Sequence, residues 1–291
     1  VGGMGALTRA LRARAEELRV EITTGALVTG IEANGIRALV RAETALGQVR
    51  IDCREVVVNC APGILDRLLG RSVAPMRFED GGAQVAISML LRRLPRLRDE
   101  AVDPVQAFSG TFYVNDSYRQ LAAAHGVAGR GDLPTPVPAL VTCTSLTDPT
   151  IVNSSTPGAQ VMNVLTLQTP HALFADQDDN KRKRVARAVI ESLNSVLAAP
   201  IEACLMSDSQ GRPCIEVHTT ADLERDLLIP GGNIFHTPLD WPFADDPARV
   251  GTWGVETDIS NVTMCGSGAQ RGGGVSGIPG QNAAYYVLTK H

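Results

Sequence analysis

Residues 264–284 read MCGSGAQRGGGVSGIPGQNAA, and this stretch sets seven glycines between a short apolar strand and a terminal helix. Glycine adopts positive φ without steric cost and has no Cβ to hold a ligand away from the backbone. The start of the following helix offers unpaired N–H groups and the positive end of a dipole. The stretch therefore predicts one wall of a cofactor site.

Neither glycine cluster of the chain completes a dinucleotide-binding fingerprint. That fingerprint needs a strand, a tight glycine turn and a helix, with an acidic residue about twenty positions later. Gly266–Gly268 follows a strand, but Arg271 stands at the sixth position and no second strand with an acidic residue follows. In Gly2–Gly5 no predicted strand leads into the glycines. Each cluster is therefore an incomplete phosphate-binding motif.

The composition is that of a soluble globular protein, with 44% hydrophobic and 20% charged residues. A net charge of −4 argues against a general nucleic-acid binder, because such proteins show a basic field over one face. The dense basic cluster Lys181–Arg184 opens a predicted amphipathic helix, and we interpret it as a solvated helix face.

The six cysteines include no CxxC pair and no Cys/His spacing suited to zinc, so no metal site is predicted. We interpret them as buried free thiols in a reducing compartment. No apolar run has the length of a membrane span, and residues 1–20 carry charges on a helical pattern. These features predict a cytoplasmic protein without a transmembrane segment.

Residues 1–73 have the pattern of part of an α/β domain. Leu7, Leu11 and Leu18 predict an amphipathic helix, and Asn34-Gly35 predicts a turn with positive φ at both centres. Strands are predicted at 20–23, 26–32 and 36–43, a strand pair at 48–53 and 55–59, and a short helix at 64–69.

Residues 74–250 have longer strands separated by loops, which suits an antiparallel sheet with helices on one side. The strands are predicted at 84–91, 139–146, 160–169 and 213–219, and the helices at 116–125, 180–197 and 221–227. A strand at 261–265 and the glycine-rich stretch then return the chain, over residues 251–291, to the first domain. The predicted fold class is α/β plus α+β.

Four separated segments resemble phytoene-desaturase-like FAD-dependent oxidoreductases. They are residues 2–11, residues 24–31, Pro230–His236 with Trp241-Pro242, and the glycine-rich stretch. The most similar branch is that of the pyridine nucleotide-disulphide oxidoreductase domain-containing proteins. The resemblance spans essentially the whole chain but not the family's first part, which carries the GxGxxG unit. It implies an incomplete FAD-binding, Rossmann-like domain with an inserted antiparallel-sheet substrate domain.

The resemblance also implies where the adenine end of FAD would lie. Val28 resembles the position whose backbone amide and carbonyl meet the adenine edge, with its side chain in the core. Cys60-Ala61 ends a strand that runs close to the cofactor in the family. Ordinary strand-end packing is the alternative explanation for the small side chain of Ala61.

The flavin end is implied by the glycine-rich stretch. Gly266, Ser267 and Gly268 would approach the ribityl and pyrophosphate portion of FAD. Gly274 and Val275 would direct main-chain N–H groups toward the flavin O2, where the helix N-terminus would stabilise negative charge that develops on reduction. A plain glycine-rich turn is the alternative.

No catalytic side chain is predicted. His218 and His236 lie in the region that the family uses for substrate, but a lone histidine is more often a hydrogen-bonded structural residue. Asp240, Trp241 and Phe243 would line a pocket or, as we favour, seal the two domains together. No Ser/His/Asp triad or carboxylate pair is evident, so a hydrolase lacks support. A flavin supplies its own reactive atom, so missing acids and bases do not count against a flavoenzyme.

The leading prediction is an FAD-dependent, dehydrogenase- or desaturase-like oxidoreductase that takes a hydride from an apolar or other small organic substrate to flavin N5. A missing N-terminal segment, encoded upstream or supplied by a partner chain, would complete the FAD site. One alternative is a truncated, non-catalytic fragment or interaction module that does not bind FAD alone. A flavin amine oxidase is the other, although 4% aromatic residues offer little material for an aromatic cage.

Overall fold

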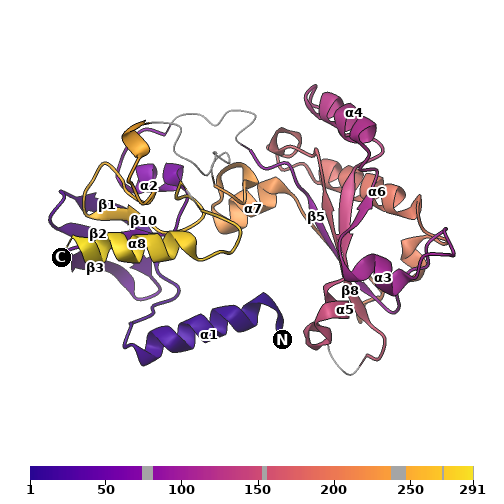
Figure 1. The fold of residues 1–291 in the computed structure, drawn as a ribbon, viewed down its shortest axis with the longest axis horizontal. Coiled ribbons are helices and arrows are strands. Elements are labelled where there is room, and N and C mark those ends of the chain that lie inside the picture. Colours follow the sequence, from indigo (N-terminus) through magenta and orange to yellow (C-terminus); the bar gives the residue numbers. More distant parts are fainter. Residues whose placement is uncertain (74–80, 153–155, 237–246, 271, 291) are drawn as a thin grey trace. The chain divides into compact units, whose positions relative to one another are not determined.

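The computed structural model describes residues 1–73, 81–152, 156–236, 247–270 and 272–290 (Figure 1). The chain divides into two compact units, of which the first comprises Val1–Glu21 and Ala83–Asp222 and the second Ile22–Gly82 and Leu223–His291. Each unit has its own cluster of buried hydrophobic side chains. The fold is mixed α/β with antiparallel sheets. The boundaries inferred from sequence at residues 73 and 250 stay predictions.

The first unit is built on an antiparallel sheet with the strand order β6-β7-β8-β5-β9. Its strands are β5 (Ala86–Leu91), β6 (Phe112–Val114), β7 (Ala139–Thr142), β8 (Gln160–Thr166) and β9 (Ile215–His218). The helices of this part of the chain are α1 (Gly3–Glu17), α3 (Pro104–Ser109), α4 (Tyr118–Ala128), α5 (Thr144–Thr147), α6 (Asp179–Asn194) and α7 (Thr220–Leu227), which crosses the boundary between the units.

One face of this sheet is buried under helices (Figure 1). Buried and half-buried residues alternate along β5 and β8, as expected when one face of an antiparallel sheet meets the core. Val185 and Val189 of α6 and Phe108 of α3 join the buried sheet residues in one cluster. Full burial of each such side chain stabilises the unit by about 1.5–3 kcal/mol. The opposite sheet face carries the half-buried and exposed residues.

Helix α1 is held at its N-terminus by a carboxylate that is distant in sequence. Asp148 Oδ2 accepts hydrogen bonds from the amides of Gly2, at 2.7 Å, and Gly3, at 2.9 Å. The carboxylate thus satisfies N–H groups that a helix start leaves unpaired and lies at the positive end of the helix dipole. Gly2 has φ of 95°, a region that glycine adopts at no cost. No residue of α1 is buried.

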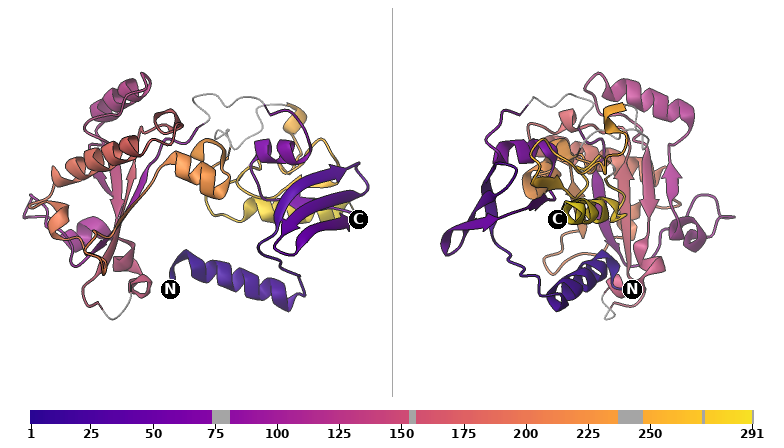
Figure 2. Two further views of the ribbon diagram at one scale, coloured as in Figure 1. Left: turned by 180° about the vertical axis from the view of Figure 1, so that it is seen from behind. Right: turned by 60° about the vertical axis from the view of Figure 1, so that its left-hand side comes forward.

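The second unit contains two small sheets (Figure 2). Strands β1 (Leu27–Ala33), β2 (Ala38–Thr44) and β3 (Gly47–Cys53) form an antiparallel sheet, whereas β4 (Val56–Val58) and β10 (Val262–Met264) pair in parallel. Helices α2 (Pro62–Leu68) and α8 (Ile278–Thr289) accompany them. The described residues of both units also contain short 3-10 helices, η2 to η6, at Pro149–Ile151, His171–Leu173, Ile201–Ala203, Pro230–Gly232 and Pro247–Arg249.

Asn261 ties the two sheets of the second unit together. Its buried side chain accepts a hydrogen bond from the Gly35 amide, at 2.9 Å, and donates one to the Arg54 carbonyl, at 2.8 Å. The contact fixes the β1–β2 turn beside the start of β4. Both polar atoms of the amide are satisfied, as a buried polar side chain requires.

Most predicted elements of the first 73 residues are present, with three corrections. Residues 20–23 form no strand, because they are exposed and find no partner strand. Only Gly35 of the predicted turn has positive φ; the Asn34 side chain instead accepts from the amides of Ile36 and Arg37, so β2 starts later, at Ala38. The predicted strand pair at 48–53 and 55–59 is wrong, since β3 pairs with β2 and β4 with β10.

The later elements agree more closely with the sequence pattern. The antiparallel sheet with helices on one face is confirmed, as are helices matching α4, α6, α7 and the terminal α8. The pattern missed α3 and β6, which are only six and three residues long. The strand predicted at 139–146 ends at Thr142, because Thr144–Thr147 form α5. All six cysteines are free, but only Cys143 and Cys204 are buried, so the prediction of burial is wrong for the other four.

Among the described residues, none of the helices combines the length and the apolar character needed to span a bilayer. No group of three or more His, Cys, Asp and Glu side chains is placed there to hold a metal ion.

Candidate cofactor and substrate sites

The parallel strands β4 and β10 bring two sequence-distant segments to one edge of a sheet. Val56 pairs with Val262 and Val58 with Met264, so both strands end together, and the Cys265 amide donates to the Val58 carbonyl at 2.9 Å. Residues 59–62 and 265–268 therefore meet at the carboxyl edge. This edge is where open α/β sheets bind their ligands.

Ala61 lies at that edge, but its small side chain has a structural explanation. It is 2% exposed and forms the N-cap of α2, and its carbonyl accepts from the amides of Ile64 and Leu65. Pro62 follows as the first helical residue, where proline is favoured. Burial at a helix start therefore accounts for alanine, and its approach to a cofactor stays a prediction.

The space beside Gly266 and Gly268 is filled by the protein itself. A Cβ on Gly266 would lie 1.6 Å from Asn59 Oδ1, and one on Gly268 would lie 2.8 Å from Pro62 Cδ and 2.9 Å from the Cys60 carbonyl oxygen. These glycines let the β10 loop pack directly on the loop that follows β4. Close packing of the chain thus explains why both positions are glycine. The expected contact of Gly266, Gly268 and the half-buried Ser267 with a ribityl chain stays a prediction.

A cavity of about 470 Å³ adjoins the same edge. Pro62 and Leu65 line it from α2, and Gly268 to Gln270 line it from the β10 loop. Arg71 also lines it and is bound by Asp258 at 2.7 Å, an ion pair that raises the pKa of the arginine. This guanidinium is therefore already neutralised within the chain.

The loop before α8 differs from the packed glycines at Gly274 and Val275, where the backbone is open and has positive φ, whereas a Cβ on Gly273 would lie 2.9 Å from Phe235 Cδ1. Gly273, Gly274 and Val275 have φ of 91°, 69° and 53° in succession. A Cβ on Gly274 would meet no atom within 4 Å, and the Val275 side chain is 77% exposed. Positive φ at a β-branched residue is a genuine outlier that costs about 1–3 kcal/mol, and such strain concentrates at ligand sites.

Helix α8 begins directly after this loop with little side-chain capping. Its N-cap residue, Gly277, has no side chain to accept from the first turn, although Ser276 Oγ accepts from the Ile278 amide at 3.3 Å. Pro279 has no N–H group, and the amides of Ile278 and Gln281 donate to Ser276 Oγ and the Gly277 carbonyl. The first turn therefore offers a ligand the Gly280 N–H group and the positive end of the helix dipole. Of the predicted cofactor residues, Gly274 and Val275 have the surroundings that suit an acidic or carbonyl-bearing ligand.

Val28 lies on β1, an edge strand of its sheet, where one side of the backbone is left without a strand partner in the described residues. The register shifts between Val28 and Gly30, which marks a bulge. Its side chain is 38% exposed, so the expectation that it belongs to the core is wrong. The backbone role toward adenine stays a prediction.

The uncovered face of the sheet in the first unit provides a separate candidate surface for a substrate. Strand register places two rows of side chains across it: the apolar-centred row Tyr113–Leu140–Leu165–Ala86–His218 and the polar row Thr142–Asn163–Ser88–Glu216. Ser88 Oγ donates to Asn163 Oδ1 at 2.9 Å within the polar row. A cavity of about 550 Å³ opens beside it, lined in part by Ser88, Leu90, Val161 and Glu216. The sequence pattern gave the alternation, but only the register aligned the polar positions.

The two histidines singled out from the sequence lie in different surroundings. His218 is half exposed on β9, and its Nε2 lies 3.6 Å from Glu216 Oε2. His236 is partly buried with φ of 65°, burial lowers its pKa, and its Nδ1 has no hydrogen-bond partner among the described residues. Asp240, Trp241 and Phe243 lie outside the described residues, as does Trp241-Pro242 of the resemblance.

Cys60 and Cys265 lie half-buried at the carboxyl edge of β4 and β10, and this partial loss of solvent raises the pKa of both thiols. They are therefore protonated at neutral pH. A thiolate is the nucleophilic form of cysteine, so thiol-based redox chemistry at this edge is disfavoured.

Comparison with known proteins gives relatives over the whole chain. An uncharacterized protein of Mycobacterium tuberculosis is 47% identical over 296 residues, which cover 99% of this chain and 54% of that protein. Pyridine nucleotide-disulfide oxidoreductase domain-containing protein 2 of Rattus norvegicus is 27% identical over 308 residues, covering 99% of this chain and 50% of that protein. No family model matches. The chain thus spans about half the length of these curated relatives.

Solved structures give weaker similarities. A flavoprotein/dehydrogenase from Cytophaga hutchinsonii has a TM-score of 0.40 at 11% identity, over 98% of this chain and 54% of that one. OxyS anhydrotetracycline hydroxylase from Streptomyces rimosus has a TM-score of 0.31 at 17% identity, over 64% and 27% of the two chains. Both scores are too low to carry an argument. The sequence comparison shows distant homologues that are named pyridine nucleotide-disulfide oxidoreductase domain-containing protein 2. Membership of the phytoene-desaturase-like subfamily stays a prediction.

Proposed function

We propose that the chain forms the second, cofactor-closing and substrate-binding part of an FAD-dependent oxidoreductase. The observation that carries this proposal is the pair of exposed, positive-φ residues Gly274 and Val275 just before the N-terminus of α8. The name of the Rattus norvegicus homologue supports oxidoreductase chemistry. Bound FAD would supply the hydride-accepting atom, N5.

In this proposal the loop before α8 binds the pyrimidine side of the flavin. The Val275 amide and the first turn of α8 would donate toward the flavin C2 carbonyl, and the dipole of α8 would stabilise negative charge there. The strained backbone at Val275 would hold its N–H group in place before the ligand arrives. The edge of β4 and β10 near Gly268 would border the ribityl chain.

The substrate would bind the uncovered sheet face of the first unit. The central side chains Leu140, Leu165 and Ala86 offer an apolar bed, which suits the predicted apolar substrate. The neighbouring row with Ser88 and Asn163 would orient a substrate that also carries a hydrogen-bonding group. Orientation on such a bed is the protein's main task in hydride transfer, because the flavin provides the reactive atom.

The proposal is tested by flavin content with and without the remaining part of the molecule. The 291-residue chain alone should elute from gel filtration without stoichiometric flavin, because it contains no complete pyrophosphate-binding turn. Co-expression with the segment that the Mycobacterium tuberculosis relative has outside the shared region should give a yellow complex. A stoichiometric flavin on the isolated chain refutes the first expectation, and a flavin-free complex refutes the FAD assignment.

A matched pair of variants tests the role of the loop in that complex. Val275→Gly keeps the N–H group and tolerates φ of 53°, so flavin binding should persist. Val275→Pro removes the N–H group and fixes φ near −65°, so flavin binding should fall at least tenfold. Equal flavin affinity in the two variants would contradict a main-chain contact at this position.

One structural feature supports the alternative that the chain is an interaction module. Strand β4 pairs only with β10 among the described residues, so the second unit presents an open strand edge. Such an edge pairs readily with another polypeptide. This alternative differs from the oxidoreductase in predicting a complex that never holds flavin.

A further inference from the structure

The sheet β1-β2-β3 has one apolar and one polar face. Strand register aligns Val28 with Ala42 and Val49, and Ile31 with Val40 and Ile51, and these residues share a face. The opposite face is mainly charged: it carries Glu32 and Asp52 on either side of Leu39, and Arg41 beside Arg50. An antiparallel sheet with such faces buries one of them and exposes the other to water.

The apolar face is only half covered. Ile31 and Ala42 are 4% exposed, and Ile31 belongs to the hydrophobic cluster of the second unit. Toward β3 the cover ends, because Val49 is 41% and Ile51 50% exposed. On the opposite edge strand, β1, Val28 is 38% exposed. The uncovered patch is therefore continuous with an existing core and lacks part of its cover.

The parallel sheet of the same unit is incomplete as well. Parallel strands normally lie in larger sheets that are covered on both faces, and an isolated two-stranded sheet is marginal. In β4 the side chain of Val57 is 49% exposed, and the strand has no partner except β10 among the described residues. On the other side of β10, Thr263 forms a bridge with Glu256. The free edge is therefore that of β4.

We propose that the patch Val28–Val49–Ile51 and the free edge of β4 form the docking surface for the polypeptide that fills the unmatched part of the relatives' length. This inference rests on the proposed function and identifies the surface where the two parts join. The incoming polypeptide places a helix with an apolar stripe on the patch, because helices are the usual cover of an exposed sheet face. It places a strand along β4, which satisfies the open backbone groups.

The size of the patch favours this occupant over a second copy of the chain. A stable dimer interface buries about 1,600 Å² in total, which three aliphatic side chains do not supply. The relatives carry nearly half of their own length outside the region shared with this chain. A polypeptide of that size can cover the patch and the β4 edge together.

The test uses the full 291-residue chain and, as its probe, the unmatched segment of the Mycobacterium tuberculosis relative produced as a separate polypeptide. Size-exclusion chromatography with light scattering should show a 1:1 complex. Val49→Glu and Ile51→Glu should each weaken the complex at least tenfold, because a carboxylate is buried without a partner. Arg50→Glu, on the opposite face of the same strand, is the matched control and should bind like the unchanged chain.

Two further measurements separate docking from folding and from flavin chemistry. Circular dichroism should show that Ile51→Glu remains folded, and hydrogen exchange should show that the complex protects the amides of β3 and β4. Absence of a complex, equal binding by the Ile51→Glu and Arg50→Glu variants, or a homodimer that Ile51→Glu abolishes would each overturn the inference. A complex without flavin would instead leave the docking surface standing and defeat the FAD assignment.

Discussion

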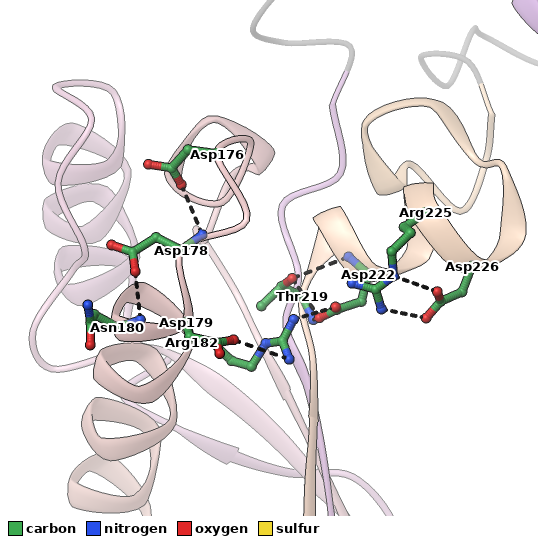
Figure 3. Close-up of polar contacts among 9 residues, drawn as sticks. All are labelled: Asp176, Asp178, Asp179, Asn180, Arg182, Thr219, Asp222, Arg225 and Asp226. Atoms are coloured by element: carbon green, nitrogen blue, oxygen red, sulfur yellow. Dashed lines mark hydrogen bonds and ion pairs between the residues drawn. The ribbon is translucent and has the colours of Figure 1, made fainter.

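Replacing Asp222 with asparagine tests the buried ion pair between helices α6 and α7 (Figure 3). Asp222 is 3% exposed, and its Oδ1 lies 2.5 Å from Arg182 Nη2. Its Oδ2 accepts hydrogen bonds from the amide and the hydroxyl of Thr219, both at 2.8 Å. Arg182 also lies near Asp179, at 3.8 Å, but that carboxylate is 76% exposed.

The expected loss follows from the number and kind of contacts. A hydrogen bond to a charged group contributes about 1.5–3 kcal/mol, and asparagine removes the charge while keeping an oxygen for Thr219. Arg182 is 34% exposed, so solvent screens part of the attraction and the loss should be about 1.5–2 kcal/mol. Asp222→Ala also removes the acceptor for the Thr219 amide and hydroxyl, and should cost about 1–3 kcal/mol more than Asp222→Asn.

Hydrogen exchange is the appropriate assay, because a chain of two compact units need not unfold in a single step. In Asp222→Asn, protection of the amides in β9 and the start of α7 should fall about tenfold or more, since 1.4 kcal/mol corresponds to a factor of ten. Asp179→Asn is the matched control and should change stability by less than about 0.5 kcal/mol. Equal effects of the two substitutions would refute the assignment of stability to the buried carboxylate.

Three further substitutions test the loops and helix ends. Val275→Gly should stabilise the second unit by about 1 kcal/mol, because relief of a strained φ exceeds the added chain entropy; a loss of stability in urea would contradict the strain. Gly266→Ala should lower stability by about 1–3 kcal/mol, because the added Cβ clashes with Asn59. A double variant that also carries Asn59→Ala should recover stability. Gly110→Ala is the control and should have little effect, because no atom lies near its Cβ position. Asp148 has its pKa lowered to about 2 by the hydroxyl of Thr150 and the amide of Gly3. The stabilisation of α1 by the Asp148 carboxylate is therefore complete above the ordinary pKa of 3.8 and is lost as pH falls toward 2. Asp148→Ala should remove exchange protection from the first turn of α1 at neutral pH. Unchanged protection would show that the carboxylate does not hold the helix.

The amino-acid sequence alone determined the elements whose patterns are local. The alternation along β5 and β8 reflects a period of two residues, and the apolar spacing in α6 reflects the helical period. The glycine-rich loop and terminal helix were also predictable, because glycine and helix-start preferences act over a few residues. The local pattern therefore predicted the loop and α8 as one wall of a cofactor site, and the family resemblance implied that this wall is the flavin end.

Only the tertiary structure decided the contacts between distant residues. Strands β4 and β10 are about two hundred residues apart in sequence, and their parallel pairing follows from packing in three dimensions. The same holds for Asp148 at the start of α1 and for Asn59 in the space beside Gly266. Glycine type alone could not separate Gly266, which the chain itself packs against, from Gly274, whose surroundings are open, because that difference depends on which atoms the fold brings near each Cα.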